Sequence, residues 1–431
     1  MPVINAFAQD AVDLAEPLTL DAAHARSCQA ALSDSDIGTV GLEIEAHLVD
    51  LHAVPDAVAW HRVEQVMKDV RAVVGSSSVT VEPGGQLELS GRPERDIVTA
   101  VAGLRRDWQG ARLALADYGL GAAFAGADPL RPSRRINPRP RYEAMEQHFA
   151  ATGRAAPGAA MMNSTAALQL NLQAGPRGGW PARVELAHRI GPTMVAIAAC
   201  SPWLHGQPTG WKSARQATWA QLDPRACGPV PGCDAGPAPS TADSDPAAAW
   251  AHFAMSAPVI IVRGHGDNAQ PVRTSVSFGQ WASGRIQLCG RQPTAADLDT
   301  HLSTLFPPVR LRGYLELRYM DVTAPRWWPA LAAVAATLLD DKTAADQARE
   351  ATERTARRWE QAARHGLRDA LLADSARRCL AIAASRAPAE LRPSVADLAE
   401  LVESGRGPGD LLASRIEQVG PLAALEELAH A

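Results

Sequence analysis

Lysine is scarce in this chain of 431 residues, and the short motifs that most often reveal a phosphate-binding or hydrolytic site are missing. Lysine occurs only at positions 68, 212 and 342, so arginine carries nearly all of the positive charge. The chain has no G-x-x-x-x-G-K-[ST] loop, no G-x-G-x-x-G that opens a helix after a strand, no G-x-S-x-G elbow and no H-E-x-x-H. If the protein binds phosphate groups, metal ions and arginine side chains would have to neutralise their charge.

The cysteines and the net charge exclude further classes of protein. The six cysteines are scattered, with no C-x-x-C pair and no histidines at matching spacing. Neither a zinc site nor a disulfide framework is indicated, and reduced thiols are expected. The 42 basic and 47 acidic residues give a net charge of -5, which argues against general binding to nucleic acid or to an anionic membrane.

Signals for export or for a membrane span are also missing. Residues 1–20 contain acidic side chains and lack a basic region before an apolar run. The longest apolar stretches, residues 193–200 and 329–339, are shorter than the roughly 20 residues that cross a bilayer. We therefore expect a cytoplasmic protein that acts on small molecules, without a nucleic-acid or membrane partner.

Four segments alternate aliphatic residues with carboxylates, amides or an arginine. They are Leu42-Glu43-Ile44-Glu45, Gln86-Leu87-Glu88-Leu89, Leu168-Gln169-Leu170-Asn171-Leu172 and Tyr314-Leu315-Glu316-Leu317-Arg318. Successive side chains of a strand point to opposite faces, so one face of the sheet would be aliphatic and the other rich in carboxylates. Clustered like charges repel unless a cation lies among them. Because hard oxygen ligands suit Mg²⁺ or Mn²⁺, this pattern predicts a metal-nucleotide site.

The helical segments between these strands predict an α+β fold, a curved antiparallel sheet backed by helices. We expect helices over residues 20–32, 60–74, 96–118 and 181–199, and strands over residues 39–49, 162–172, 259–263 and 274–278. Residues 131–141 form a predicted loop because of their repeated prolines, and residues 228–247 a predicted mobile surface loop. The chain is expected to be one catalytic domain over residues 1–431, with a sheet core at about 38–325 and a helical region at about 327–431.

Each polar position has a structural alternative. A single pair of strand carboxylates usually faces solvent, and an isolated arginine such as Arg318 is equally expected to be an ion-pair partner. The amides Asn163, Gln169 and Asn171 fit metal ligands or solvated side chains about equally well. A further polar cluster, which suits a substrate carboxylate or a base, comprises Arg215, Trp219, Asp223 and Arg225.

Taken in order, these motifs resemble the glutamate-cysteine ligase family, in its plant-like and actinobacterial branch. The matching stretches lie between about residues 38 and 340: V-G-L-E-I-E (40–45), V-E-P-G-G-Q-L-E-L-S-G (81–91), R-Y-E-A-M (141–145), M-M-N-S-T-A-A-L-Q-L-N (161–171), S-A-R (213–215) with Trp219, Asp223 and Arg225, and H-L-S-T-L-F-P-P-V-R-L-R-G-Y-L-E-L-R (301–318). Composition and length are most similar to the mycobacterial branch, which supplies γ-glutamylcysteine for ergothioneine synthesis.

The resemblance implies a fold, a reaction and a set of residues. The fold is a glutamine-synthetase-like sheet that forms a funnel, and Mg²⁺ or Mn²⁺ is bound with ATP by Glu43, Glu45, Glu82, Glu88 and Glu316. Arg318 matches the catalytic, phosphate-contacting arginine. The implied substrate-binding residues are Arg215, Arg225, Trp219, Gln169, Asn171, Arg141 and Tyr142.

The implied reaction joins the γ-carboxylate of L-glutamate to the amine of L-cysteine at the expense of ATP, by way of a γ-glutamyl phosphate. No obligate protein partner is expected, and the loop at residues 228–247 is a candidate lid. Another carboxylate–amine ligase of the same fold, a two-metal phosphohydrolase and a non-catalytic nucleotide sensor remain alternatives, because metal-binding acids alone do not specify a reaction.

Overall fold

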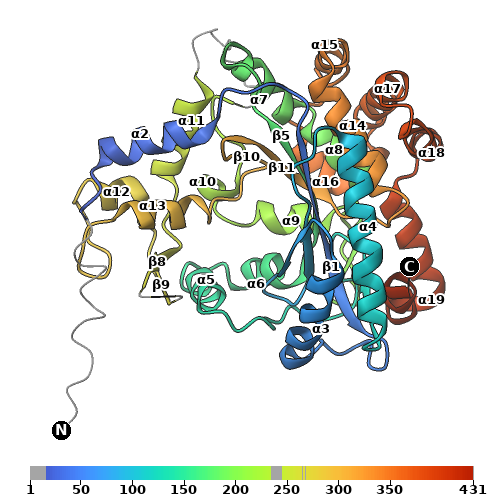
Figure 1. Cartoon of the computed structure of the whole chain (residues 1–431), viewed down its shortest axis with the longest axis horizontal. Coiled ribbons are helices and arrows are strands. Elements are labelled where there is room, and N and C mark those ends of the chain that lie inside the picture. Colours follow the sequence, from blue (N-terminus) through green and yellow to red (C-terminus); the bar gives the residue numbers. More distant parts are fainter. Residues whose placement is uncertain (1–15, 234–244, 265, 267, 431) are drawn as a thin grey trace.

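The computed structural model describes residues 16–233, 245–264, 266 and 268–430 (Figure 1). The strands are β1 (Val40–Asp50), β2 (Ser78–Val81), β3 (Leu87–Ser90), β4 (Leu120–Ala123), β5 (Ala167–Gln173), β6 (Trp203–Leu204), β7 (Gln207–Pro208), β8 (Ile261–Arg263), β9 (Ala269–Pro271), β10 (Val309–Leu311) and β11 (Tyr314–Asp321).

The helices divide into those before β8 and those after it. The first group is α2 (Leu20–Ala31), α3 (Trp60–Val73), α4 (Ile97–Ala116), α5 (Pro140–Ala151), α6 (Ala155–Ser164), η1 (Arg177–Gly179), α7 (Trp180–Arg189), α8 (Gly191–Ala198), α9 (Ala214–Ala220), α10 (Pro224–Cys227) and α11 (Pro246–Ser256). The second is α12 (Phe278–Ala282), α13 (Ala295–Leu302), α14 (Trp328–Asp340), α15 (Lys342–Ala351), α16 (Trp359–His365), η2 (Gly366–Arg368), α17 (Ala370–Arg386), α18 (Arg392–Glu403) and α19 (Pro408–His430). None of the described helices is long and apolar enough to cross a membrane.

The main sheet is antiparallel and mixes strands from distant parts of the chain. Its order is β10-β11-β5-β1-β3-β2, and β4 pairs with the far end of β1. Strand β1 is central: Glu43 lies opposite Gln169 of β5, and Glu45 lies opposite Glu88 of β3. On the next strand, Glu316 of β11 lies opposite Asn171 of β5. This register confirms the α+β fold with an antiparallel sheet and brings all four alternating segments side by side.

The aliphatic positions of these strands form the core. Leu42, Ile44, Leu168 and Leu170 are fully buried, as the alternating pattern predicts. Helices α4 and α14 pack against the middle strands, and α8 packs against β11. In Figure 1, α4 and the C-terminal helices lie on one side of the sheet and α5, α6 and α9 lie on the other. Helices α5, α6 and α9 therefore cover the polar face of the sheet.

Three predicted elements differ from the structure. The expected strand at 162–172 begins only at Ala167, because residues 155–164 form α6, and a short apolar run does not by itself distinguish a strand from a buried helix. The expected helix at 181–199 is two helices, α7 and α8. The second starts at Gly191, where an added Cβ would lie 2.1 Å from the Trp359 ring, with Pro192 in its first turn. Residues 274–278 make only an isolated bridge at Ser277, which caps α12.

The remaining predictions agree more closely. The loop over residues 131–141 is confirmed up to Pro140, where α5 begins, and the strand expected at 259–263 is the shorter β8. Much of the predicted mobile loop at residues 228–247 lies outside the described residues, since only 228–233 and 245–247 are described.

Candidate active site

A cavity of about 290 Å³ lies on the polar face of the sheet. Strands β1, β3, β5, β10 and β11 form its floor, and α5, α6, α9 and the segment after α13 form its walls. Its lining residues are Glu43, Glu45, Glu82, Pro83, Gln86, Glu88, Arg141, Tyr142, Met145, Met161, Met162, Thr165, Gln169, Arg215, Trp219, Ser303, Phe306, Arg310, Arg312, Glu316 and Arg318. The charges within it are segregated, with acids toward β1 and β3 and arginines toward β10 and β11.

The acids of β1 are held by neutral donors. The Asn171 Nδ2 donates to Glu43 Oε1 over 2.8 Å, and the Gln169 Nε2 donates to Glu45 Oε1 over 3.2 Å. The second Glu45 oxygen accepts from the backbone N–H of Ala167 at 2.8 Å. Because none of these donors carries a formal charge, they orient the carboxylates without neutralising them.

A tight turn brings Glu82 to the same cavity. The Glu82 N–H donates to the Gln86 carbonyl over 2.9 Å, closing a turn in which Gly85 has a φ of +89°. A Cβ at Gly84 would lie 2.1 Å from the Asn163 carbonyl oxygen, so no side chain fits there. The Gln86 amide donates to the Thr165 carbonyl over 2.9 Å and fastens the turn to the end of α6. The turn therefore requires glycine at both positions, at Gly84 for lack of space and at Gly85 for its positive φ.

The acidic wall carries more negative charge than its surroundings balance. Burial, followed by the neighbouring Glu88 carboxylate, raises the pKa of Glu45 to about 7 and also raises the pKa of Glu43. The same two causes raise the pKa of Glu82 well above its ordinary range. A cation would relieve this repulsion. Within the part of the chain that the structure describes, however, no three acidic, imidazole or thiol groups converge closely enough to hold a metal ion as they stand.

Glu316 has a different environment from the other acids. Arg310 forms a bidentate pair with it, through Nε to Oε2 and through Nη2 to Oε1 at 2.9 Å. Arg312 reaches Oε1 at 3.4 Å and Arg318 reaches Oε2 at 3.2 Å. Burial alone would raise the pKa of Glu316, but Arg310, Arg318 and Arg312 outweigh it and lower the pKa to about 2. This carboxylate is therefore ionised and anchors three arginines.

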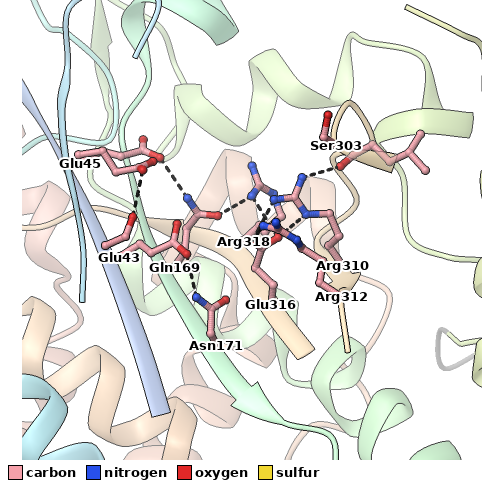
Figure 2. A network of polar contacts seen from close by, with 12 residues as sticks. Glu43, Glu45, Gln169, Asn171, Ser303, Arg310, Arg312, Glu316 and Arg318 are labelled. Carbon is pink, nitrogen blue, oxygen red and sulfur yellow. Dashed lines mark hydrogen bonds and ion pairs between the residues drawn. The ribbon is translucent and has the colours of Figure 1, made fainter. Parts of the chain in front are cut away.

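Arg318 connects the two charged walls (Figure 2). Its Nη1 donates to Gln169 Oε1 over 2.5 Å, while the amide of the same Gln169 donates to Glu45. The guanidinium also lies 5.8 Å from the centre of the Phe306 ring. The Gln169 side chain thus orients Arg318 and links it, through its own amide, to Glu45.

Arg215 enters the cavity from α9. Its Nη2 donates to the Arg318 carbonyl over 2.7 Å, and its Nη1 lies 3.8 Å from the buried Asp321 carboxylate. That Nη1 is buried and has no hydrogen-bond acceptor among the described residues. Asp321 itself accepts from Ser201 and Ser213, so it holds the start of α9 in place. A ligand oxygen would satisfy the free Nη1.

The structure brings together most of the predicted site residues, but not all. Glu43, Glu45, Glu82, Glu88, Glu316, Arg318, Arg215, Trp219, Gln169, Arg141 and Tyr142 line the cavity. Asn171 does not line the cavity and instead orients Glu43 through the hydrogen bond to its carboxylate. Arg225 lies outside it, in a bidentate pair with Asp223 and a 2.8 Å bond to Ser275. Arg141 is near the opening, where it donates to Ser303 Oγ over 2.9 Å.

Sequence reasoning missed two groups of lining residues. Arg310 and Arg312 lie on and just after β10, a strand of three residues that is too short to give an alternating signal of its own. Their spacing two residues apart, just before the Glu316 strand, is nevertheless consistent with one shared face. The apolar wall, made of Met145, Met161, Met162 and Phe306, lies on helices and a loop, where the aliphatic runs gave no indication of a cavity.

The chain is similar to known proteins over most of its length. Residues 39–427 match the model of glutamate-cysteine ligase family 2 (GCS2). The chain is 50% identical over 398 residues to glutamate–cysteine ligase EgtA of Mycolicibacterium smegmatis, covering 92% of each chain. It is 46% identical over 400 residues to glutamate–cysteine ligase EgtA of Mycobacterium tuberculosis strain H37Rv, covering 93% of this chain and 91% of that one.

More distant relatives share part of the sequence or the fold alone. The chloroplastic glutamate–cysteine ligase of Arabidopsis thaliana is 28% identical over 274 residues, which are 63% of this chain and 50% of that one. The crystal structure of glutamate–cysteine ligase from Francisella tularensis in complex with AMP superposes with a TM-score of 0.55 at 14% identity, over 92% of this chain and 88% of that one. On the extent of the family match and on the identity to the mycobacterial relatives, the chain belongs to glutamate-cysteine ligase family 2.

Proposed function

We propose that this protein is an ATP-dependent ligase that joins the γ-carboxylate of L-glutamate to the amine of L-cysteine. The observation that carries the proposal is that buried glutamates and a cluster of arginines line one and the same cavity. The acidic wall suits the cation that accompanies the nucleotide, and the arginine wall suits phosphate and carboxylate oxygens. Membership of the ligase family narrows the choice of reaction.

The donor set fits a hard divalent cation, Mg²⁺ or Mn²⁺. Carboxylate oxygens are the ligands these ions prefer, and burial together with the neighbouring carboxylates raises the pKa values of Glu43, Glu45 and Glu82, which a bound cation would offset. We assign Glu43, Glu45, Glu82, Glu88 and Glu316 as ligands of the cation. The Glu316 carboxylate would share its oxygens between the cation and its arginines. When bound, the cation would neutralise phosphate charge and polarise the phosphoryl group.

The arginines stabilise the negative charge that develops in the first chemical step. An oxygen of the glutamate γ-carboxylate attacks the γ-phosphorus of ATP, the bond to the β-phosphate oxygen breaks, and ADP leaves with the bonding electrons. Negative charge spreads over the transferred phosphoryl oxygens in the transition state. The planar fork of Arg318 matches these oxygens, and its bonds to Glu316 and Gln169 hold it ready without reorganisation.

The second step makes the amide bond. The amine of cysteine attacks the acyl carbon of γ-glutamyl phosphate, inorganic phosphate leaves, and the amine loses a proton. Arg215 is suited to the glutamate α-carboxylate because its buried Nη1 lacks an acceptor. The apolar wall of Met145, Met161, Met162 and Phe306 reduces access of water to the acyl phosphate. Arg141 and Tyr142 border the opening, where they are placed to contact substrates.

Release of ADP distinguishes this proposal from its alternatives. We expect stoichiometric ADP and γ-glutamylcysteine when ATP, glutamate, cysteine and Mg²⁺ are all present, and little ADP when cysteine is omitted. A two-metal phosphohydrolase would release ADP with or without cysteine, and a sensor would release none. ADP release coupled to a different amine at an equal rate would instead indicate another carboxylate–amine ligase.

Three wider expectations accompany the ligase proposal. We infer a role in ergothioneine synthesis from the identity to the mycobacterial relatives. We also treat residues 1–431 as one catalytic domain, because α14 packs on β5 and α19 packs on β4 and β1, so the C-terminal helices complete the core of the sheet. We place the enzyme in the cytoplasm, where ATP and reduced thiols are available.

A further inference from the structure

A second cavity, of about 360 Å³, lies beyond the C-terminal end of α5. Its lining residues are His148, Phe149, Ala151, Thr152, Arg154, Asp223, Ala226, Cys227, Pro258, Ile260, Arg273, Thr274 and Ser275. None of them lines the active-site cavity. The two cavities share only helix α5, whose first turns carry Tyr142 and Met145 to the active site and whose end carries His148 and Phe149 to the second cavity.

The second cavity has an excess of positive charge. Its one acid, Asp223, is satisfied on both oxygens by Arg225, at 3.1 Å and 2.7 Å. Arg154 and Arg273 bond only to neutral oxygens: the carbonyl of Thr152 at 3.3 Å and the side-chain Oε1 of Gln147 at 2.8 Å. Among the described residues neither guanidinium forms an ion pair, and although Arg154 lies near enough to Asp223 to help lower the pKa of that carboxyl, Arg225 already pairs with both of its oxygens. Both guanidinium groups can therefore meet an anion.

Part of the lining of the second cavity is apolar. Phe149, Ala226 and Ile260 are buried, at 4%, 2% and 2% exposure, and Pro258 completes the surface. An inorganic anion would leave this surface in contact with water. A ligand with a short hydrocarbon body and one carboxylate would cover it while meeting the guanidinium groups.

We infer that the second cavity binds a small aliphatic carboxylate, with the anion between Arg154 and Arg273 and the hydrocarbon against Phe149 and Ile260. The inference goes beyond the ligase reaction and does not depend on it, because it uses no residue of the active-site cavity. Cations are disfavoured there by the two guanidinium groups, and a longer polyanion would find only one pair of arginines among the lining residues.

A matched series of three ligands tests the inference on the full-length protein by ligand-observed NMR. 3-Methylbutanoate, 3-methylbutanamide and 3-methylbutylamine have the same hydrocarbon and differ in charge. We expect the carboxylate to bind at least about fivefold more tightly than the amide, and the amine not to bind. Acetate, which lacks the hydrocarbon, should bind at least about fivefold more weakly than 3-methylbutanoate.

Variants locate the binding. Arg154→Gln combined with Arg273→Gln should weaken 3-methylbutanoate about tenfold. Arg263→Gln, which removes an exposed arginine on the neighbouring strand β8, should leave the affinity unchanged. Saturating glutamate and a non-hydrolysable ATP analogue should not compete. Equal binding of carboxylate and amide, an unchanged affinity in the double variant, or displacement by the active-site ligands would each overturn the inference.

Discussion

Removal of Arg310 tests whether the arginine cluster is held by the buried Glu316 carboxylate. Arg310→Met keeps the length of the side chain but deletes both bonds to Glu316, which is only 1% exposed. The pKa of Glu316 falls from 4.5 to about 2 in the folded protein, a net stabilisation of about 3 kcal/mol that remains after the arginines have outweighed the opposing effect of burial. Arg310 makes the largest contribution, so we expect a loss of about 2 kcal/mol in the free energy of unfolding.

The sign of the pH dependence follows from the same shift. Because the folded pKa of Glu316 lies below the unfolded value, its stabilising effect is complete above pH 4.5 and is lost as the pH falls toward about 2. The measurement is therefore urea denaturation at pH 7, where the full effect is present. Arg312→Met is the matched control, because its side chain is 52% exposed and contacts the same carboxylate at 3.4 Å. It should cost about 0.5 kcal/mol or less.

A double variant separates the pair from general damage. In Arg310→Met combined with Glu316→Gln the buried charge is gone, so the loss should be smaller than the sum of the two single losses by at least about 1 kcal/mol. A cost below about 0.5 kcal/mol for Arg310→Met, or strictly additive losses, would refute the view that this pair organises the arginines.

Four further outcomes follow from the site. Glu88→Gln should abolish metal-dependent turnover while thermal unfolding stays nearly unchanged, because an amide keeps the shape but loses the charge that binds a hard cation; full activity would remove Glu88 from the ligand set. Arg318→Lys should lower kcat at least about 100-fold, since an ammonium cannot reproduce a bidentate fork, and wild-type kcat would make Arg318 structural. Burial lowers the pKa of His301 from 6.5 to about 4 in the folded protein, so the free energy of unfolding should fall by up to about 3 kcal/mol as the pH falls from 6.5 to 4. A His301→Gln variant with the same acid unfolding profile would contradict this. Coupling to 2-aminobutyrate should be measurable but weaker than to cysteine, by roughly 1 to 3 kcal/mol in kcat/KM, whereas equal kcat/KM for unrelated amines would exclude a cysteine-specific site.

The sheet and its polar face were predictable because alternation leaves a direct mark in the sequence. In β1, Leu42 and Ile44 had to be buried together, so Glu43 and Glu45 had to share the other face. The same reasoning could not separate Asn171 from Gln169, although only Gln169 lines the cavity. Both point to the polar face, and the difference depends on pairing with Glu43 across the strands.

Residues outside long strands were less accessible to prediction. Arg310 lies in a strand of three residues, and Met161 and Met162 lie at the end of a helix that reads as an apolar strand. Arg225 was expected among the substrate-binding residues because it follows Trp219 closely in sequence. It is instead turned toward Asp223, which caps α10 and accepts its guanidinium. In each case tertiary packing, rather than local pattern, decides which way the side chain points.

The transfer of oxygen from glutamate to phosphate tests the ligase mechanism most directly. Glutamate labelled with ¹⁸O on both γ-carboxylate oxygens is incubated with ATP, cysteine, Mg²⁺ and the enzyme, and the products are analysed by mass spectrometry. The account predicts γ-glutamylcysteine that retains one ¹⁸O and inorganic phosphate that has gained the other, because the carboxylate itself attacks the phosphorus. Unlabelled phosphate, with no γ-glutamylcysteine formed, would contradict it and show that water is the acceptor.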